Sequence, residues 1–208
     1  MRLWLWRIAI ILLVAGFVGA QMWLNKTPDE LERVKLPPPP TYKKATLTPG
    51  RVVELHTSRG EIDFVLFEKD SPKTTKRIAD LVQKGCYNGV KFSRVENWII
   101  QTDECKEKVK PMGIEVREGL SHAKGAVGMA RLGNDFNSNT SVFYILLDPQ
   151  SGLDLQYTVF GRLISGMDVA MKMQKNDVIK SAEVRPLTEA DKKKFYEMLT
   201  IEAERKTE

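Results

Sequence analysis

The stretch Val90–Glu104, VKFSRVENWIIQTDE, decides the fold and the site of this 208-residue chain. Apolar and polar residues alternate along it, as they do in a half-buried β-strand. Arg94 stands among apolar neighbours, and Gln101 follows an aromatic and aliphatic run seven residues later. The stretch therefore places a guanidinium and a carboxamide beside an otherwise apolar surface, which a purely structural strand does not need.

Other strand-like runs surround this stretch. Residues 53–57 and 62–66 keep a period of two, and the turn between them contains glycine, so they predict a hairpin. Three further runs have the apolar and β-branched composition of short strands. These runs are GAVGMAR, SVFYILL and YTVFGRLI.

Two helices interrupt the strands. Asp70 or Ser71 caps the first, Pro72 lies in its first turn and Gly85 ends it. A second helix is predicted to begin near Asp168. Many short strands, two helices and glycine-containing turns predict a mostly β fold, a closed or nearly closed antiparallel barrel.

Residues 1–24 are the most apolar part of the chain. Two arginines precede an uncharged run from Ile8 to Leu24, at the short edge of a membrane-spanning length. One interpretation is an uncleaved signal-anchor, and the other is a secretory signal cleaved after Ala20. Apolar residues continue to Leu24, beyond that cleavage site, so the anchor is favoured. Either interpretation puts the domain outside the cytoplasm: periplasmic, extracellular, lumenal or, after cleavage, secreted.

The regions on either side of the predicted domain, residues 51–187, differ from it in composition. Residues 25–50 contain four consecutive prolines, which favour a semi-rigid polyproline II spacer. Residues 188–208 have a helical pattern with Thr188 as its cap. A solvated helix lying on the barrel is favoured there over an appendage that binds a partner.

The basic net charge of +5 is concentrated near the amino terminus. The first 50 residues hold seven basic and three acidic residues, which leaves 25 against 24 for the rest of the chain. The domain is therefore almost neutral and lacks a basic stripe for phosphate contacts. No nucleic-acid partner is expected.

From about Val52 to Glu183, the chain resembles the cyclophilin family of peptidyl-prolyl cis-trans isomerases. Six segments in family order carry the resemblance, although each is weak alone. The resemblance implies a closed eight-stranded β-barrel capped by two helices, with the active groove on its outer face, and a monomer that acts on proline-containing polypeptides. The segments are GEIDFVLFEKDSPKTTKRI, YNGVKFSRV, WIIQTDE, HAKGAVGMAR, SVFYI and LDLQYTVFGRLISGMDV.

The resemblance also implies the roles of individual residues. Arg94 is implied as the main catalytic residue, and Gln101 as the residue that holds it and the substrate backbone. The implied reaction, rotation about an X-Pro bond, needs no base, nucleophile, metal or cofactor. The implied substrate-binding residues are Phe92, Trp98, Ile99, Ala130, Arg131, Tyr144, Leu153 and Tyr157.

Some positions depart from the family pattern. Val142 replaces a glutamine and cannot make its hydrogen bonds, Ser93 replaces a histidine, and Gly152 replaces a tryptophan associated with cyclosporin binding in some members. These departures support an alternative hypothesis, a low-activity module that binds proline-containing peptides on the same fold. An assisting role in the folding of exported or membrane-proximal proteins is the function favoured here.

The remaining reactive residues give weaker signals. His56 and His122, the only histidines, lack partners at a metal-ligand spacing, so no metal site is expected. Cys86 and Cys105 are the only cysteines. A disulfide and two reduced buried thiols are equally compatible with the sequence.

Overall fold

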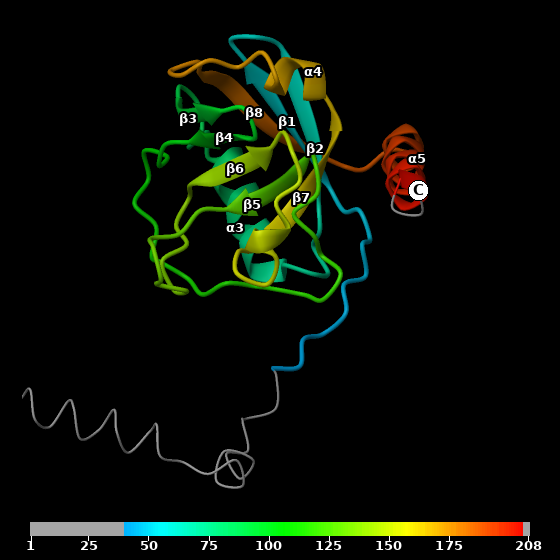
Figure 1. Ribbon diagram of the computed structural model, residues 1–208. Helices are drawn as coiled ribbons and strands as arrows, with labels where there is room; N and C mark the ends of the chain where they lie inside the picture. The colour runs from blue at the N-terminus through cyan, green and yellow to red at the C-terminus, as the bar shows by residue number, and fades with distance from the viewer. Residues whose placement is uncertain (1–39, 206–208) are drawn as a thin grey trace, which may run out of the picture. The chain divides into compact units, whose positions relative to one another are not determined.

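The computed structural model describes residues 40–205, and its compact unit begins at Tyr42. Eight strands form one antiparallel sheet in the order β3-β4-β6-β5-β7-β2-β1-β8 (Figure 1). The predicted eight-stranded, mostly β architecture is therefore confirmed. The strands are β1 (Val52–Thr57), β2 (Glu61–Leu66), β3 (Phe92–Glu96), β4 (Ile99–Thr102), β5 (Ala126–Met129), β6 (Phe143–Leu146), β7 (Val159–Ser165) and β8 (Ile179–Arg185).

The sheet curls but does not close, so the prediction of a closed barrel is wrong. Its edge strands β3 and β8 form no ladder. They are joined by an isolated bridge between Lys91 and Val178 and by short backbone hydrogen bonds, such as Phe92 N–H to the Asp177 carbonyl at 2.8 Å. These contacts lie at the beginning of each edge strand or just before it, and the two strands then diverge.

The first predicted helix is α3 (Pro72–Gln83), which packs against β7 and β8. Pro72 occupies its first turn, as expected, and Gly85 follows its end with a φ of 67°. Ser71 is at the N-cap position, but its hydroxyl donates to the Val159 carbonyl and accepts no hydrogen bond from the first turn of the helix. The second predicted helix is a single turn, α4 (Met167–Ala170), so of the two helices predicted within the domain only α3 is long.

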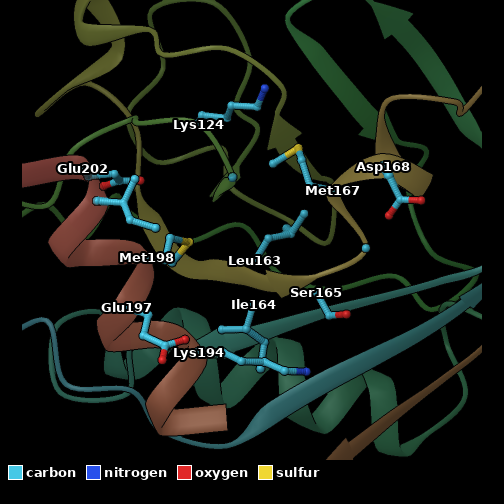
Figure 2. A pocket seen from close by; sticks show the side chains of 13 residues that line it. Lys124, Leu163, Ile164, Ser165, Met167, Asp168, Lys194, Glu197, Met198 and Glu202 are labelled. Carbon is cyan, nitrogen blue, oxygen red and sulfur yellow. The ribbon is translucent and has the colours of Figure 1, made fainter. Parts of the chain in front are cut away.

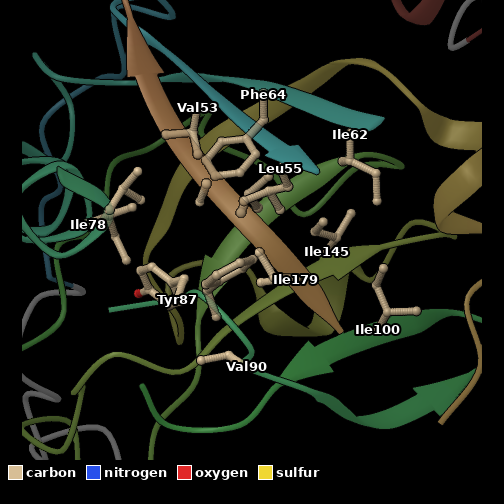
Figure 3. Close-up of a cluster of buried hydrophobic side chains, with 14 of the residues drawn as sticks. Val53, Leu55, Ile62, Phe64, Ile78, Tyr87, Val90, Ile100, Ile145 and Ile179 are labelled. Atoms are coloured by element: carbon tan, nitrogen blue, oxygen red, sulfur yellow. The ribbon is translucent and has the colours of Figure 1, made fainter. Parts of the chain in front are cut away.

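The main hydrophobic core lies on the inner face of the curled sheet. Phe64, Leu55 and Ile145 are among its fully buried side chains (Figure 3). Phe64, Phe143 and Phe160 are at most 1% exposed, and their ring centroids lie 6.2 to 6.5 Å apart. Tyr87 packs edge-on against Phe143 and donates its hydroxyl to the Ser141 carbonyl. A buried tyrosine needs such an acceptor for its hydroxyl group.

A second cluster lies on the opposite face of the sheet. In β2, Val65 belongs to this cluster, whereas Phe64 and Leu66 belong to the main core, as the period of two predicts. Ile99 and Tyr144 are part of the same second cluster. Strands that are buried on both faces explain why several runs in the sequence are almost continuously apolar.

The C-terminal helix α5 (Glu189–Arg205) covers part of this second face. Thr188 caps it as predicted, because its Oγ1 accepts a hydrogen bond from the Asp191 N–H at 3.2 Å. Phe195 is fully buried, 5.9 Å from the Phe67 ring by centroid distance. The helix is therefore docked on the sheet rather than frayed.

Part of the predicted linker packs on the domain. The backbone amides of Thr46 and Leu47 donate to the Asp70 carboxylate at 2.8 and 3.0 Å, and Ala45 N–H donates to the Glu118 carbonyl. The predicted anchor or signal at residues 1–24 lies outside the described residues. Between residues 40 and 205, no helix has the length and apolar character needed to span a membrane.

Candidate active site

Three side chains predicted for the site stand in one row across the sheet. Arg94 on β3 pairs with Gln101 on β4, and Gln101 pairs with Tyr144 on β6. Residues paired directly across antiparallel strands project from the same face. The guanidinium, the carboxamide and the tyrosine ring therefore belong to one surface.

A β-bulge determines which way Arg94 points. The register of β3 against β4 shifts between Phe92, which pairs with Thr102, and Arg94, which pairs with Gln101. Two steps along β3 thus match one step along β4, so the extra residue, Ser93, reverses the facing of the strand. Without the bulge, Arg94 would share the face of Phe92.

Phe92 is the predicted site residue that the structure places elsewhere. Its side chain is fully buried in the main core, on the face of the sheet opposite Arg94, and it does not line the cavity described next. The prediction that Phe92 contacts substrate is corrected accordingly. The bulge at Ser93 is the physical reason, because it separates two residues that simple alternation would place together.

The other nine predicted site residues line one cavity of about 190 Å³. Strands β3, β4 and β6 supply one side of it, and the segments after β5 and around the 3₁₀ turn Ser151–Leu153 supply the other. The sequence thus brings together residues that are up to 63 positions apart. The lining residues are Arg94, Trp98, Ile99, Gln101, Ala130, Arg131, Tyr144, Leu153 and Tyr157.

Gly128 on β5 makes room for the ring of Tyr144. The two residues pair directly across the sheet, and a Cβ atom at position 128 would lie 2.4 Å from the hydroxyl oxygen and Cζ of Tyr144. Real Cβ contacts are essentially never below 3.0 Å. The glycine therefore lets the tyrosine lie flat across the neighbouring strand.

Arg94 is partly exposed and already has partners. Its Nε donates to Glu96 Oε1 at 2.7 Å, and its Nη2 lies 3.3 Å from Glu96 Oε2. Its guanidinium carbon lies 4.9 Å from the centre of the Trp98 ring. Hydrogen bonding from Arg94 lowers the pKa of Glu96, so this carboxylate stays ionised. Sequence reasoning did not single out Glu96, although residues i and i+2 of one strand share a face.

Arg131 lies across the cavity between two aromatic rings. Its guanidinium carbon is 4.3 Å from the ring centre of Tyr157 and 4.4 Å from that of Phe136. It also donates to the backbone carbonyls of Gln156 and Gly133. These contacts hold Arg131 against the wall of the cavity.

His122 lies behind the cavity, and sequence reasoning did not assign it a role. Its side chain is fully buried, with Nδ1 2.8 Å from Asp154 Oδ1 and Nε2 2.9 Å from the Tyr144 hydroxyl. Burial lowers the pKa of His122, and Asp154 only partly opposes this shift. Burial also raises the pKa of Tyr144. One signal in the sequence pointed to a residue such as His122. Tyr144 was predicted to lie in the substrate pocket, and a buried tyrosine hydroxyl needs a hydrogen-bond partner.

Comparison with known proteins identifies the fold and the family. The family model described as cyclophilin type peptidyl-prolyl cis-trans isomerase/CLD matches residues 52–194. The chain belongs to the cyclophilin family. Among relatives of this cyclophilin, peptidyl-prolyl cis-trans isomerase-like 1 of Emericella nidulans is 36% identical over 150 residues, which cover 66% of this chain and 88% of that protein.

Solved structures agree on the fold of this cyclophilin. A cyclophilin type peptidyl-prolyl cis-trans isomerase from Cryptosporidium parvum superposes with a TM-score of 0.60 and 24% identity, over 67% of this chain and 99% of that chain. A second structure, from the same organism and obtained in the presence of the dipeptide Ala-Pro, gives a TM-score of 0.59 at 24% identity, over 65% and 99% of the two chains.

The cyclophilin also has a larger groove, of about 590 Å³, between α5 and β7 (Figure 2). Leu163, Met167 and Met198 face it, and the charges around it are of both signs. It contains none of the nine residues of the smaller cavity. We place the active site in the smaller cavity because only there do a guanidinium, a carboxamide and an apolar pocket converge.

Two further sequence questions concern metals and cysteines. In the part of the cyclophilin that the structure describes, no group of three or more histidine, cysteine, aspartate or glutamate residues is arranged to hold a metal ion.

Cys86 and Cys105, whose state the sequence left open, form a disulfide with a Cα–Cα distance of 5.4 Å. It ties the end of α3 to the segment that follows β4.

Proposed function

We propose that this cyclophilin catalyses cis-trans rotation about X-Pro bonds in polypeptides, with Arg94 as the catalytic residue and Gln101 as the residue that orients it and the substrate. The observation that carries the proposal is the row Arg94–Gln101–Tyr144 at the wall of one cavity. Membership of the isomerase family supports the activity. The roles of the individual residues are inferred from their chemistry and position.

The reaction requires only that the twisted amide be bound more tightly than the planar one. Amide resonance gives the X-Pro bond a barrier of about 18 to 20 kcal/mol, so uncatalysed exchange takes tens to hundreds of seconds. As the bond twists, resonance is lost and the prolyl nitrogen becomes an acceptor. A guanidinium that donates to this nitrogen stabilises the twisted state and not the planar one, which is the requirement for catalysis.

The cavity suits a prolyl ring. Ile99 and Leu153 supply aliphatic surface, and the Tyr144 and Trp98 rings supply aromatic surface. Gln101, next to Arg94 in the sheet, is placed to hydrogen-bond the substrate backbone. Excluding water from the ring would leave the Arg94 donors for the substrate nitrogen. The Cryptosporidium parvum relative was crystallised in the presence of the dipeptide Ala-Pro, a molecule of the same chemical class as the proposed substrate.

We further propose that the domain works outside the cytoplasm, tethered to a membrane through residues 1–24 and acting as a monomer on exported or membrane-proximal proteins. The uncharged run before residue 25 supports the tether. The disulfide between Cys86 and Cys105 supports an oxidising compartment. Carbonate washing of membranes should leave the intact chain in the pellet; a soluble species beginning at Gln21 would instead indicate cleavage and secretion.

The activity is tested on a fragment of residues 40–208, with a protease-coupled or NMR exchange assay on Ala-Xaa-Pro-Phe peptides. Exchange that is faster than in buffer and proportional to protein concentration is expected. The alternative is a module that binds prolyl peptides without turning them over. Two observations support it: Val142 cannot make the hydrogen bonds of the glutamine that it replaces, and Arg94 is already paired with Glu96. Saturable binding of the peptides with exchange no faster than in buffer would establish that alternative and reject the enzyme.

A further inference from the structure

His122 connects two walls of the cavity that are distant in the sequence. Through Nε2 it contacts the hydroxyl of Tyr144 on β6, and through Nδ1 it contacts Asp154, the residue after Leu153. We propose that His122 is a positioning residue, whose neutral ring fixes the Tyr144 ring and the Leu153 segment around the prolyl ring. The inference rests on the proposed isomerase function of the same cavity.

The hydrogen bonds specify one tautomer of His122. Asp154 Oδ1 also accepts the backbone N–H of His122 at 2.7 Å, so the oxygen that faces Nδ1 is a hydrogen-bond acceptor. An acceptor at 2.8 Å from Nδ1 requires the proton on that nitrogen. Nε2 then carries a lone pair, and the Tyr144 hydroxyl donates to it. This arrangement gives both nitrogens of the buried His122 ring and the buried Tyr144 hydroxyl a partner, in a chain that begins at the partly exposed Asp154.

The same residue also anchors the segment that carries Leu153 and Tyr157. Besides the two bonds to Asp154, the His122 carbonyl accepts the backbone N–H of Gln150 at 2.8 Å. Three hydrogen bonds thus join His122 to residues 150–154, and the Tyr157 ring lies edge-on to the imidazole at 6.5 Å. The imidazole makes only the Nδ1 bond to Asp154 and the Nε2 bond to Tyr144, and the other two bonds to residues 150–154 come from the His122 backbone. Loss of the imidazole would therefore free the Tyr144 hydroxyl and loosen the segment that carries Leu153, while Arg94 and Gln101 on β3 and β4 would keep their pairing.

Protonation of His122 would disturb this chain. A proton on Nε2 turns that nitrogen into a donor toward Tyr144, whose own hydroxyl proton must then turn away from the ring. A buried donor without an acceptor is unfavourable. Burial already lowers the pKa of His122 below its ordinary value of 6.5, so the neutral form is the one present at neutral pH.

The charged surroundings of His122 agree with a neutral ring that titrates in acid. The ionisable groups that face it are Asp154, Tyr144 and Tyr157. Arg131 is close enough to act on Tyr144, and Arg117 and Glu118 line a small cavity with Asp154. Because the folded-state pKa of His122 is lowered, its contribution to stability is complete above pH 6.5 and declines as the pH falls below it. Peptide binding depends on the folded protein alone, so it should decline only at the lower pH at which His122 becomes protonated in the folded state.

The test combines NMR of the two histidines with steady-state kinetics on residues 40–208. The chain has only His56 and His122, so their ring signals can be assigned by one substitution. His122 is expected as the Nδ1–H tautomer, with titration below pH 6.5. His56→Gln, at a side chain 38% exposed, is the matched control and should leave the kinetics and the acid limb unchanged.

His122→Asn and Tyr144→Phe separate the two halves of the chain. Asparagine retains a donor toward Asp154 but does not reach Tyr144, and phenylalanine keeps the ring without its hydroxyl. For each variant we expect KM to rise about tenfold and kcat to change less than about threefold. The reason is that the pocket binds the prolyl ring equally in the planar and the twisted state, so its loss weakens both by the same amount. His122→Asn should also lose the acid limb of kcat/KM.

Three outcomes would overturn the inference. One is an Nε2–H tautomer of His122 in the wild-type protein, a measurement that does not depend on any variant folding. Another is a wild-type KM in both folded variants. The third is an acid limb that persists in His122→Asn. A wild type without isomerase activity would reject the proposed function. The role of His122 would still be decided by its tautomer and by the dissociation constants of the variants for prolyl peptides.

Discussion

The guanidinium of Arg94 is held by Glu96, two residues further along β3, with Nε 2.7 Å from the carboxylate. Nε and Nη2 take part in this pair, so the Nη1 edge lies outside it. The Trp98 ring lies 4.9 Å from the same guanidinium. Arg94 is therefore partly oriented before any substrate arrives, and its Nη1 edge is left to face the cavity.

Arg94→Ala should abolish most of the isomerase activity. We expect kcat/KM to fall by about a hundredfold, or ~2.7 kcal/mol of transition-state stabilisation, while the fold and peptide binding are largely retained. Arg94→Lys should not restore the activity, because an ammonium lacks the planar donor fork. Exchange spectroscopy measures the turnover, and circular dichroism checks the fold. An alanine variant as active as the wild type would exclude the proposed role.

Glu96→Gln tests whether the ion pair matters for turnover. Both side chains are over 40% exposed, and exposed ion pairs contribute little. We therefore expect kcat/KM to stay within about threefold of the wild type. Hydrogen bonding from Arg94 lowers the pKa of Glu96, so we assign the acid limb to His122 and expect it to persist in Glu96→Gln. An acid limb that disappears in Glu96→Gln would reassign that limb from His122 to Glu96.

Gly128→Ala should displace the Tyr144 ring. The added Cβ would lie 2.4 Å from atoms of that ring, and the strands on both sides limit any adjustment. Overpacking of this kind destabilises a fold by roughly 1–3 kcal/mol, and KM should rise about tenfold as the ring moves. Gly152→Ala is the matched control, since nothing lies within 4 Å of the Cβ position at residue 152, and this residue precedes Leu153 in the same 3₁₀ turn. Chemical denaturation and steady-state kinetics give the free energy of unfolding and KM of both variants. Equal changes in Gly128→Ala and Gly152→Ala would contradict the proposed clash with Tyr144.

Local sequence signals predicted strand-like runs at β1 to β7 and helix α3 because their causes are local, whereas no such run was identified at β8 (Ile179–Arg185). Alternation, a proline in the first turn and a terminating glycine act within a few residues. Closure of the sheet could not be predicted in this way. It depends on where β3 and β8 meet, and these strands are separated by more than 80 residues of chain.

The site residues were predicted through family resemblance rather than periodicity, and the resemblance also gave Phe92, which the structure buries in the main core. Strict alternation gives Phe92 and Arg94 the same face, whereas the bulge at Ser93 sends them to opposite faces. No bulge signal is visible in that stretch of sequence. The link from His122 to Asp154 spans 32 residues and needs the folded loop, whereas Glu96 could have been found from its spacing to Arg94.

Loss of the disulfide between Cys86 and Cys105 should destabilise the domain without removing its site. The bridge closes a loop with a sequence separation of 19, for which the loss of chain entropy in the unfolded state corresponds to about 3 kcal/mol. Urea denaturation of the Cys86→Ser, Cys105→Ser double variant should show this loss. Reduced wild-type protein serves as the second measurement, and unchanged midpoints in both would contradict a stabilising bridge.

The C-terminal helix should contribute to the stability of the domain because one of its side chains completes the second hydrophobic cluster. Phe195 is fully buried against Phe67, whereas its neighbour Tyr196 is 51% exposed. The buried Arg162 also pairs with Glu202 on the same helix. Phe195→Ala should therefore reduce the free energy of unfolding by about 3–5 kcal/mol, and Tyr196→Ala by much less.

Urea denaturation of the two neighbouring variants makes this comparison at almost the same place on α5. A small effect at both positions would mean that the helix detaches in solution and acts as an appendage for a partner. A large effect confined to Phe195 would mean that α5 is part of the domain. In that case truncation before Thr188 should expose Phe67 and the other residues of the second cluster beneath it, which predicts aggregation of the shortened domain.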